Sequence, residues 1–139
     1  MNPAGHILII DDEASLRQTL ARILQRAGYE VTTAADGKEG LTLVSEHPFD
    51  LVYSDIRMPD MSGLELLKRF QIENAASRGV MFSMHAEPIY ASRAIKSGAF
   101  GYVSKSAGAD ELATAVTKAA SGERYLDRDT ASKLAFNLY

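Results

Sequence analysis

The sequence contains no cysteine, which excludes disulfide scaffolds, thiolate metal sites and thiol nucleophiles. It has no apolar run that approaches the roughly 18 residues of a membrane span. Its start, MNPAGHILII, lacks the basic segment of a signal peptide. A large excess of one charge is also missing, since 15 basic and 18 acidic residues leave a net charge of −3. This balance argues against nucleic-acid binding by bulk charge. We expect a soluble cytoplasmic protein that binds neither membranes nor, through this chain, DNA.

Length and composition favour one globular domain. The chain has 139 residues, of which 46% are hydrophobic and 24% are charged, and these values are ordinary for a globular protein. A domain of this size buries roughly two-thirds of its surface, so it folds without disulfides or a structural metal.

Short apolar runs alternate with segments whose apolar residues recur at helical spacing. Strands are predicted at residues 6–10, 30–34, 51–54, 80–84 and 99–104, each short, and the length and Ile content of the first suit a strand buried on both faces. Helices are predicted between the strands and after the last one, with stops at Gly28, Gly98 and Gly122, and Asp36-Gly37 is predicted to form a turn. The alternation favours an α/β fold with a doubly wound, five-strand parallel sheet in the flavodoxin-like order 2-1-3-4-5.

In this order the ligand site lies at the carboxyl ends of strands one and three. Strand one ends in Asp11 and Asp12, and strand three is followed by Asp55, so three carboxylates converge there. Ser83 and Lys105 flank them from strands four and five. The carboxylates repel one another and suit a hard cation such as Mg²⁺, and one of them can act as a nucleophile toward phosphorus. The alternative is that the aspartates only cap the helices that follow.

Four segments then resemble the receiver domain of two-component response regulators. They are ILIIDDE (7–13), LVYSDIRMPDMSG (51–63), MFSMHAEP (81–88) and GAFGYVSK (98–105), in family order and spacing. The resemblance covers essentially residues 5–122. It implies the flavodoxin-like receiver fold, with a receiver domain at 1–122 and a C-terminal extension, or the start of a linker to an output domain, at 123–139.

The resemblance also implies a phosphoacceptor site. Asp55 would take a phosphoryl group from a sensor histidine kinase in two-component signal transduction. Asp12 would ligate Mg²⁺ directly, Asp11 mainly through water, and the backbone carbonyl of Arg57 would complete the protein ligands of the metal. Such a protein is a signalling phosphoacceptor rather than an enzyme, and it catalyses only its own phosphorylation and dephosphorylation.

Three further roles follow from the resemblance. Lys105 would contact the phosphoryl oxygens, Ser83 would be the hydroxyl that moves to hydrogen-bond them, and Tyr102 would be the aromatic side chain that rotates inward with Ser83. This switch would control an output, which we expect to be transcription, and would favour a phosphorylation-dependent homodimer.

The C-terminal segment AVTKAASGERYL (115–126) resembles that of receivers that precede a LuxR-type helix-turn-helix DNA-binding domain. The chain is either a natural single-domain receiver or one that lacks its output domain, and we favour the second. DNA would then be contacted only by the missing domain.

Two other classes of function stay open. One is a pseudo-receiver, a protein-interaction module that works without phosphorylation, although the intact set of site residues weighs against it. The other is an aspartate-nucleophile phosphatase, which needs a second acid just after the nucleophile. The residue two positions after Asp55 is Arg57, which argues against that enzyme.

Overall fold

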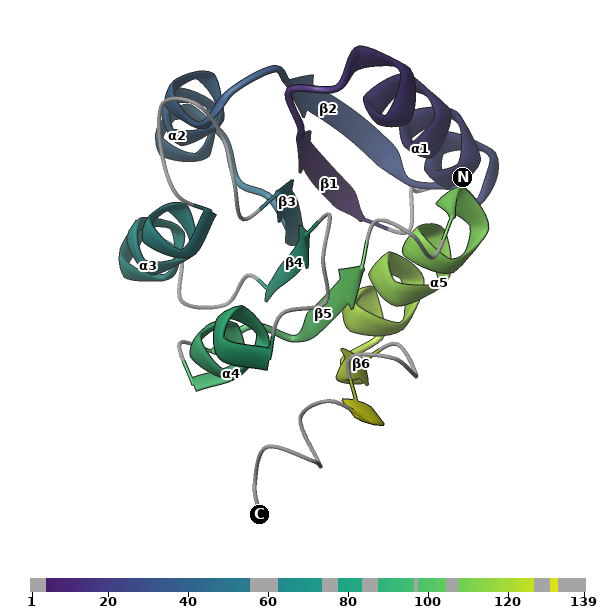
Figure 1. The fold of residues 1–139 in the computed structure, drawn as a ribbon. Helices are drawn as coiled ribbons and strands as arrows, with labels where there is room; N and C mark the ends of the chain where they lie inside the picture. Colours follow the sequence, from purple (N-terminus) through teal and green to yellow (C-terminus); the bar gives the residue numbers. More distant parts are fainter. Residues whose placement is uncertain are drawn as a thin grey trace.

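A computed structural model describes residues 5–55, 63–73, 78–83, 88–96, 98–104, 108–126 and 131–132 of the chain. They form a parallel sheet covered by helices on both faces (Figure 1). The strands are β1 (His6–Ile10), β2 (Glu30–Ala34), β3 (Leu51–Asp55), β4 (Arg78–Ser83), β5 (Gly101–Ser104) and β6 (Tyr125–Leu126). Their order across the sheet is β2-β1-β3-β4-β5-β6, which confirms the predicted doubly wound parallel sheet.

The sixth strand was not expected from the sequence. β6 follows the helix at Ala109–Ala120 and pairs in parallel with β5, with Gly101 opposite Tyr125 and Tyr102 opposite Leu126. β3 also extends one residue further than predicted, to Asp55, and β4 begins two residues earlier, at Arg78. The core of the predicted topology is unchanged, because β6 only extends the sheet at its outer edge.

The helices lie in two layers. They are α1 (Ala14–Arg26), α2 (Gly37–Glu46), α3 (Gly63–Glu73), α4 (Pro88–Lys96) and α5 (Ala109–Ala120). α1 and α5 cover one face of the sheet, and α2, α3 and α4 cover the other (Figure 1). This arrangement buries both faces of the central strands, as their continuous apolar sequences require.

Alternate residues of each strand therefore enter different cores. Ile7, Ile9 and Tyr53 pack against α1 and α5, whereas Leu8 and Ile10 pack against α2 and α3. A third cluster, beneath α4, is built from Leu67, Met81, Ala94, Ala99 and Tyr102.

Glycine and aspartate fix the ends of the helices. Gly28, Gly98 and Gly122 follow α1, α4 and α5 with φ of +101°, +99° and +94°, a conformation that glycine adopts without strain, and all three predicted stops are confirmed. The predicted turn at Asp36-Gly37 is instead the start of α2. Asp36 is its N-cap, and the Asp36 side chain accepts a hydrogen bond of 2.8 Å from the Glu39 amide.

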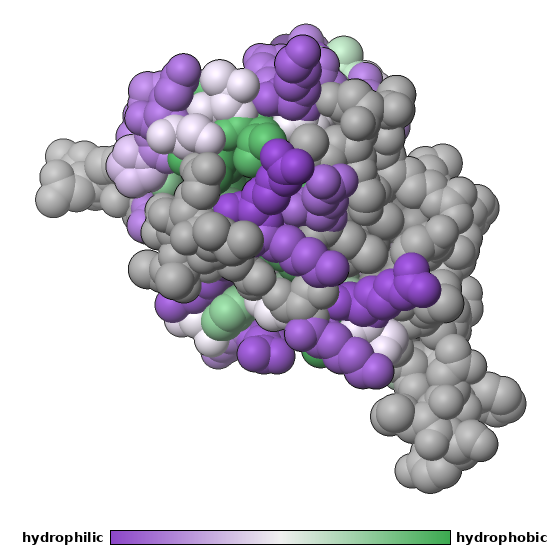
Figure 2. Space-filling view, turned by 90° about the vertical axis from the view of Figure 1, so that its left-hand side faces the viewer, coloured by the Kyte–Doolittle hydropathy of each residue, from purple (hydrophilic) through white to green (hydrophobic). Residues whose placement is uncertain are grey.

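The surface over α2 and α3 is mainly hydrophilic among the coloured residues, with hydrophobic areas between the hydrophilic side chains (Figure 2). The exposed charged side chains of α3 contribute to this hydrophilic surface, among them Glu65, Lys68 and Arg69. Among the described residues, no helix is both long and apolar enough to cross a membrane.

Candidate functional site

The point where strand order reverses lies between β1 and β3, which pair in parallel from Ile7 opposite Leu51 to Ile10 opposite Ser54. One step further along this register, Asp11 faces Asp55. Both residues are almost fully buried, with 0% and 4% of their surfaces exposed. Two carboxylates therefore meet at the carboxyl edge of the sheet, where open α/β sheets bind their ligands.

Asp11 is held by backbone and side-chain hydrogen bonds. Its amide donates to the carbonyl of Ala34 at the end of β2, over 3.1 Å. Its Oδ1 accepts the amide of Glu13 over 3.0 Å. Its own carbonyl accepts Nη1 of Arg17, on α1, over 2.6 Å. The turn after β1 is thus fixed on both sides of Asp12, whose side chain is exposed.

Asp11, Asp12 and Asp55 form one carboxylate cluster. Each offers a ligand oxygen, and these three oxygens lie within 4.8 Å of one another. Opposite ligand oxygens on an octahedral Mg²⁺ lie about 4.2 Å apart, twice the usual metal–oxygen distance. The limit of 4.8 Å is slightly wider than that span, and the Asp12 side chain is exposed. An all-oxygen set of this kind fits a hard divalent cation, so the cluster could bind a metal ion.

The capping alternative is not supported for α1. Its N-cap is Glu13, and no side chain makes a cap hydrogen bond there. The Asp11 carboxylate bonds instead to the Glu13 amide within the turn, and Asp12 is not the cap. These aspartates are thus not placed primarily to start the helix.

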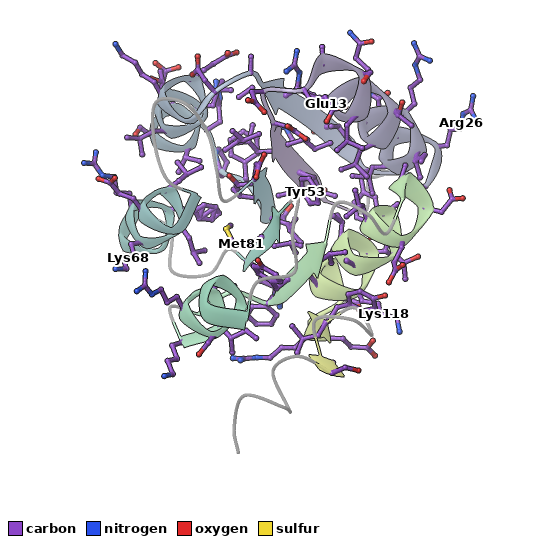
Figure 3. The ribbon with its side chains drawn as sticks, in the orientation of Figure 1. Glu13, Arg26, Tyr53, Lys68, Met81 and Lys118 are labelled. Atoms are coloured by element: carbon purple, nitrogen blue, oxygen red, sulfur yellow. The ribbon has the colours of Figure 1, made fainter. Side chains whose placement is uncertain are left out.

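Tyr53 lies just beneath the cluster on β3. Its side chain is fully buried and projects toward α1 and α5, whereas Met81 on β4 projects to the opposite face (Figure 3). Burial raises the pKa of the Tyr53 hydroxyl well above its ordinary value, and the charges of Asp11 and Asp55 raise it further. The phenol therefore stays protonated next to the carboxylates.

The structure brings together only part of the predicted site. Arg57 and Lys105 lie outside the described residues, and of Ser83 the backbone alone is described. That backbone ends β4, one residue beyond Phe82, which is opposite Asp55. Tyr102 is fully buried in the cluster beneath α4, with Leu126 of β6 packed against the same cluster.

Sequence reasoning missed two residues of this site, Arg17 and Tyr53. A signal exists for each: Arg17 is a cation in the first turns of a helix that follows two aspartates, and Tyr53 is a polar aromatic residue inside a buried strand. Neither signal is decisive alone, because only the folded chain places these groups against the carboxylates.

Comparison with known proteins identifies the family. Residues 7–117 match the response regulator receiver domain. This chain belongs to that family. Receiver domains are signalling proteins of two-component systems rather than enzymes in the usual sense, and they interact with histidine kinases.

Individual relatives agree with this assignment. The receiver is 34% identical over 119 residues to the transcriptional regulatory protein FixJ of Bradyrhizobium diazoefficiens, a match that covers 86% of this chain and 58% of FixJ. A LuxR-family response regulator from Aurantimonas sp. SI85-9A1 superposes with a TM-score of 0.88 and 32% identity, covering 96% of each chain.

A response regulator from Burkholderia pseudomallei, solved with a phosphorylated aspartic acid, a calcium ion and citrate, has a TM-score of 0.74 and 31% identity. The match covers 84% of this chain and 69% of that one. The receiver spans between 20% and 58% of the length of the curated relatives that it matches. Several of those relatives are transcriptional regulators.

Proposed function

We propose that this receiver is a phosphoacceptor with Asp55 as the acceptor residue. The observation that carries the proposal is the meeting of Asp11, Asp12 and Asp55 within 4.8 Å at the strand-order reversal of a receiver sheet. Asp55 combines a nucleophilic carboxylate with near-complete burial. Burial limits attack by water on an acyl phosphate formed there, so the phosphorylated state persists long enough to be read.

The proposed reaction is a phosphoryl exchange. A carboxylate oxygen of Asp55 attacks the phosphorus of a phosphohistidine on the kinase. An O–P bond forms as the N–P bond breaks, and the imidazole leaves with the electron pair and takes a proton from solvent. In a separate dephosphorylation step, a water oxygen attacks the same phosphorus as the bond from Asp55 to phosphorus breaks, so inorganic phosphate is released and the carboxylate of Asp55 is restored.

We propose Mg²⁺ as the metal of the carboxylate cluster. Asp12 would bind it directly, Asp11 mainly through water, and Asp55 and the backbone carbonyl of Arg57 would complete the protein ligands. When bound, the ion supplies positive charge to the phosphoryl oxygens. The calcium ion in the phosphorylated Burkholderia relative is likewise a hard cation.

Three residues would convert phosphorylation into a change of shape. Lys105 would hold the phosphoryl oxygens, Ser83 would hydrogen-bond them, and Tyr102 would move with Ser83. The partners would be a sensor histidine kinase and, in a dimer favoured by phosphorylation, a second copy of the chain. Similarity to FixJ and to the DNA-binding transcriptional regulator NtrC supports a DNA-binding output domain outside this receiver. We also propose a cytoplasmic site of action.

The test is phosphorylation by acetyl phosphate with and without Mg²⁺, read by intact mass. Wild type should gain one phosphoryl group only when Mg²⁺ is present. Asp55→Asn should gain none, while Asp110→Asn, which removes an exposed carboxylate on α5, should behave as wild type. No gain in wild type, together with no Mg²⁺ binding, would reject the proposal in favour of a pseudo-receiver that acts through protein contacts alone.

A further inference from the structure

Arg17 is a half-buried cation whose position is not explained by the helix that carries it. It lies near the start of α1, where the helix dipole disfavours positive charge, and the first turn of α1 contains no acidic residue to offset it. Its guanidinium instead turns back toward β1 and donates to the carbonyl of Asp11 over 2.6 Å. A hydrogen bond from a charged donor at this distance is strong.

The bonded carbonyl belongs to the peptide unit that joins Asp11 to Asp12. The Glu13 amide, which donates to Oδ1 of Asp11 over 3.0 Å, belongs to the next peptide unit. Both peptides around Asp12 are therefore fixed by hydrogen bonds. This matters because the Asp12 side chain is exposed and lacks the packing that holds Asp11 and Asp55. Its direction depends on the backbone beneath it.

We infer that Arg17 is a positioning residue for the metal site: it holds the Asp11–Asp12 turn so that the Asp12 carboxylate points at the cation. The inference rests on the proposed function. Arg17 touches neither the metal nor the phosphoryl group in this role and acts through the backbone of Asp11.

Charge and position predict opposite results when Arg17 is removed. As a nearby positive charge, Arg17 opposes the binding of a divalent cation, so charge alone predicts tighter Mg²⁺ binding without it. As a support for the turn, it preorganises the ligands, so its loss weakens binding. Substitution of a residue that orients metal ligands commonly lowers metal affinity by roughly 10- to 100-fold.

The experiment compares Arg17→Met with Arg22→Met by calorimetric titration of the folded proteins with Mg²⁺. Arg22 is an exposed residue of the same helix, so both variants lose one positive charge and only the first loses the bond to Asp11. We expect Arg17→Met to bind Mg²⁺ roughly 10-fold more weakly and Arg22→Met to match wild type. Arg17→Lys should recover most of the affinity, because its ammonium can donate to the same carbonyl.

Phosphorylation by acetyl phosphate gives a second readout. In Arg17→Met the Mg²⁺ concentration for half-maximal rate should rise with the dissociation constant, while the maximal rate at saturating Mg²⁺ changes little. General damage to the fold would instead lower the maximal rate and leave the half-maximal concentration unchanged. If Arg17→Met is unfolded, Arg17→Gln is read by the same criteria, because its short neutral amide cannot replace the guanidinium.

Equal or tighter Mg²⁺ binding in Arg17→Met than in Arg22→Met overturns the positioning role. The two proposals fail in different ways. A wild-type chain that neither binds Mg²⁺ nor accepts a phosphoryl group contradicts the proposed function. A wild-type chain that does both, with variants that bind alike, contradicts only the role of Arg17.

Discussion

Nη1 of Arg78 donates a hydrogen bond of 3.0 Å to the carbonyl of Ala120 and so joins the first residue of β4 to the last residue of α5. The guanidinium carbon of Arg78 lies 5.3 Å from the centre of the Phe100 ring, and the guanidinium carbon of Arg124 lies at the same distance from that ring. Arg78 thus satisfies a carbonyl that the helix leaves unpaired at its end and also packs against the segment before β5.

We predict that Arg78→Met lowers the free energy of unfolding by about 2 kcal/mol, because a partly buried, charged hydrogen bond and a cation–π contact are lost together. Urea denaturation measures the change. Arg69→Met is the matched control, since Arg69 pairs only with Glu65 in the described structure and both side chains are about half exposed. That surface pair should contribute less than about 0.5 kcal/mol. Equal losses in the two variants would contradict the prediction.

Gly101 allows β6 to approach β5 closely. A Cβ at this position would lie 3.1 Å from the Tyr125 carbonyl oxygen and 3.4 Å from a methyl of Val80. Backbone oxygen cannot move away as a flexible side chain can, so Gly101→Ala should displace β6. We predict a loss of about 1 kcal/mol in the free energy of unfolding of the full chain, measured in urea.

A shortened chain separates this effect from general crowding. In a chain that ends at Gly122, Gly101→Ala should cost clearly less, because the Tyr125 carbonyl is gone and only the Val80 contact remains. The difference between the two losses measures the coupling of Gly101 to β6. If the loss is the same in both chains, β6 does not depend on Gly101.

Much of the fold was predictable because β1 and β3 are short, mainly apolar runs that end at acidic residues, and the sheet order follows from the alternation of strands and helices. β6 was not predictable. Two residues, Tyr125 and Leu126, carry no periodic pattern, and they form a strand only because β5 offers a free edge. Asp36 shows a second limit of prediction from sequence, because aspartate is common both in turns and at helix N-caps.

The candidate site, like the fold, was predictable from the sequence only in part. Asp11, Asp12 and Asp55 were predictable because they end strands that topology places side by side. The contact of Arg17 with the Asp11 carbonyl was not, because it depends on how α1 packs against the sheet. The place of Tyr53 beneath the carboxylates depends on which face of β3 each residue occupies, and the continuous apolar run did not show that.

Tyr53 should make the protein sensitive to alkali. Burial, reinforced by the charges of Asp11 and Asp55, holds the pKa of its hydroxyl well above the ordinary value of 10.0 in the folded chain. Its contribution to stability is complete below pH 10 and is lost as the pH rises toward the folded pKa, because only the unfolded chain then releases the proton. The loss amounts to about 1.4 kcal/mol per pH unit.

We therefore predict that Tyr53→Phe has a shallower decline of unfolding free energy above pH 10 than wild type, measured by urea denaturation at a series of pH values. The comparison is internal, because every other titrating group is common to the two proteins. Parallel curves above pH 10 would show that Tyr53 ionises in the fold as easily as in the unfolded chain.

Added Mg²⁺ should reverse the effect of Asp12→Asn on the stability of the fold relative to wild type. Without a divalent ion, Asp12→Asn removes one of three negative charges within 4.8 Å and should raise the unfolding temperature slightly, since each such pair in water repels by about 1 kcal/mol or less. With Mg²⁺ at 100 times its dissociation constant, wild type should gain about 2.7 kcal/mol, and Asp12→Asn should gain far less. Thermal unfolding with and without MgCl₂, at constant ionic strength, measures both effects.

Asp110→Asn, which removes an exposed charge on α5 outside the carboxylate cluster, should show the full wild-type gain. An equal Mg²⁺ gain in Asp12→Asn would exclude Asp12 as a ligand, and no gain in wild type would exclude the cluster as a magnesium site.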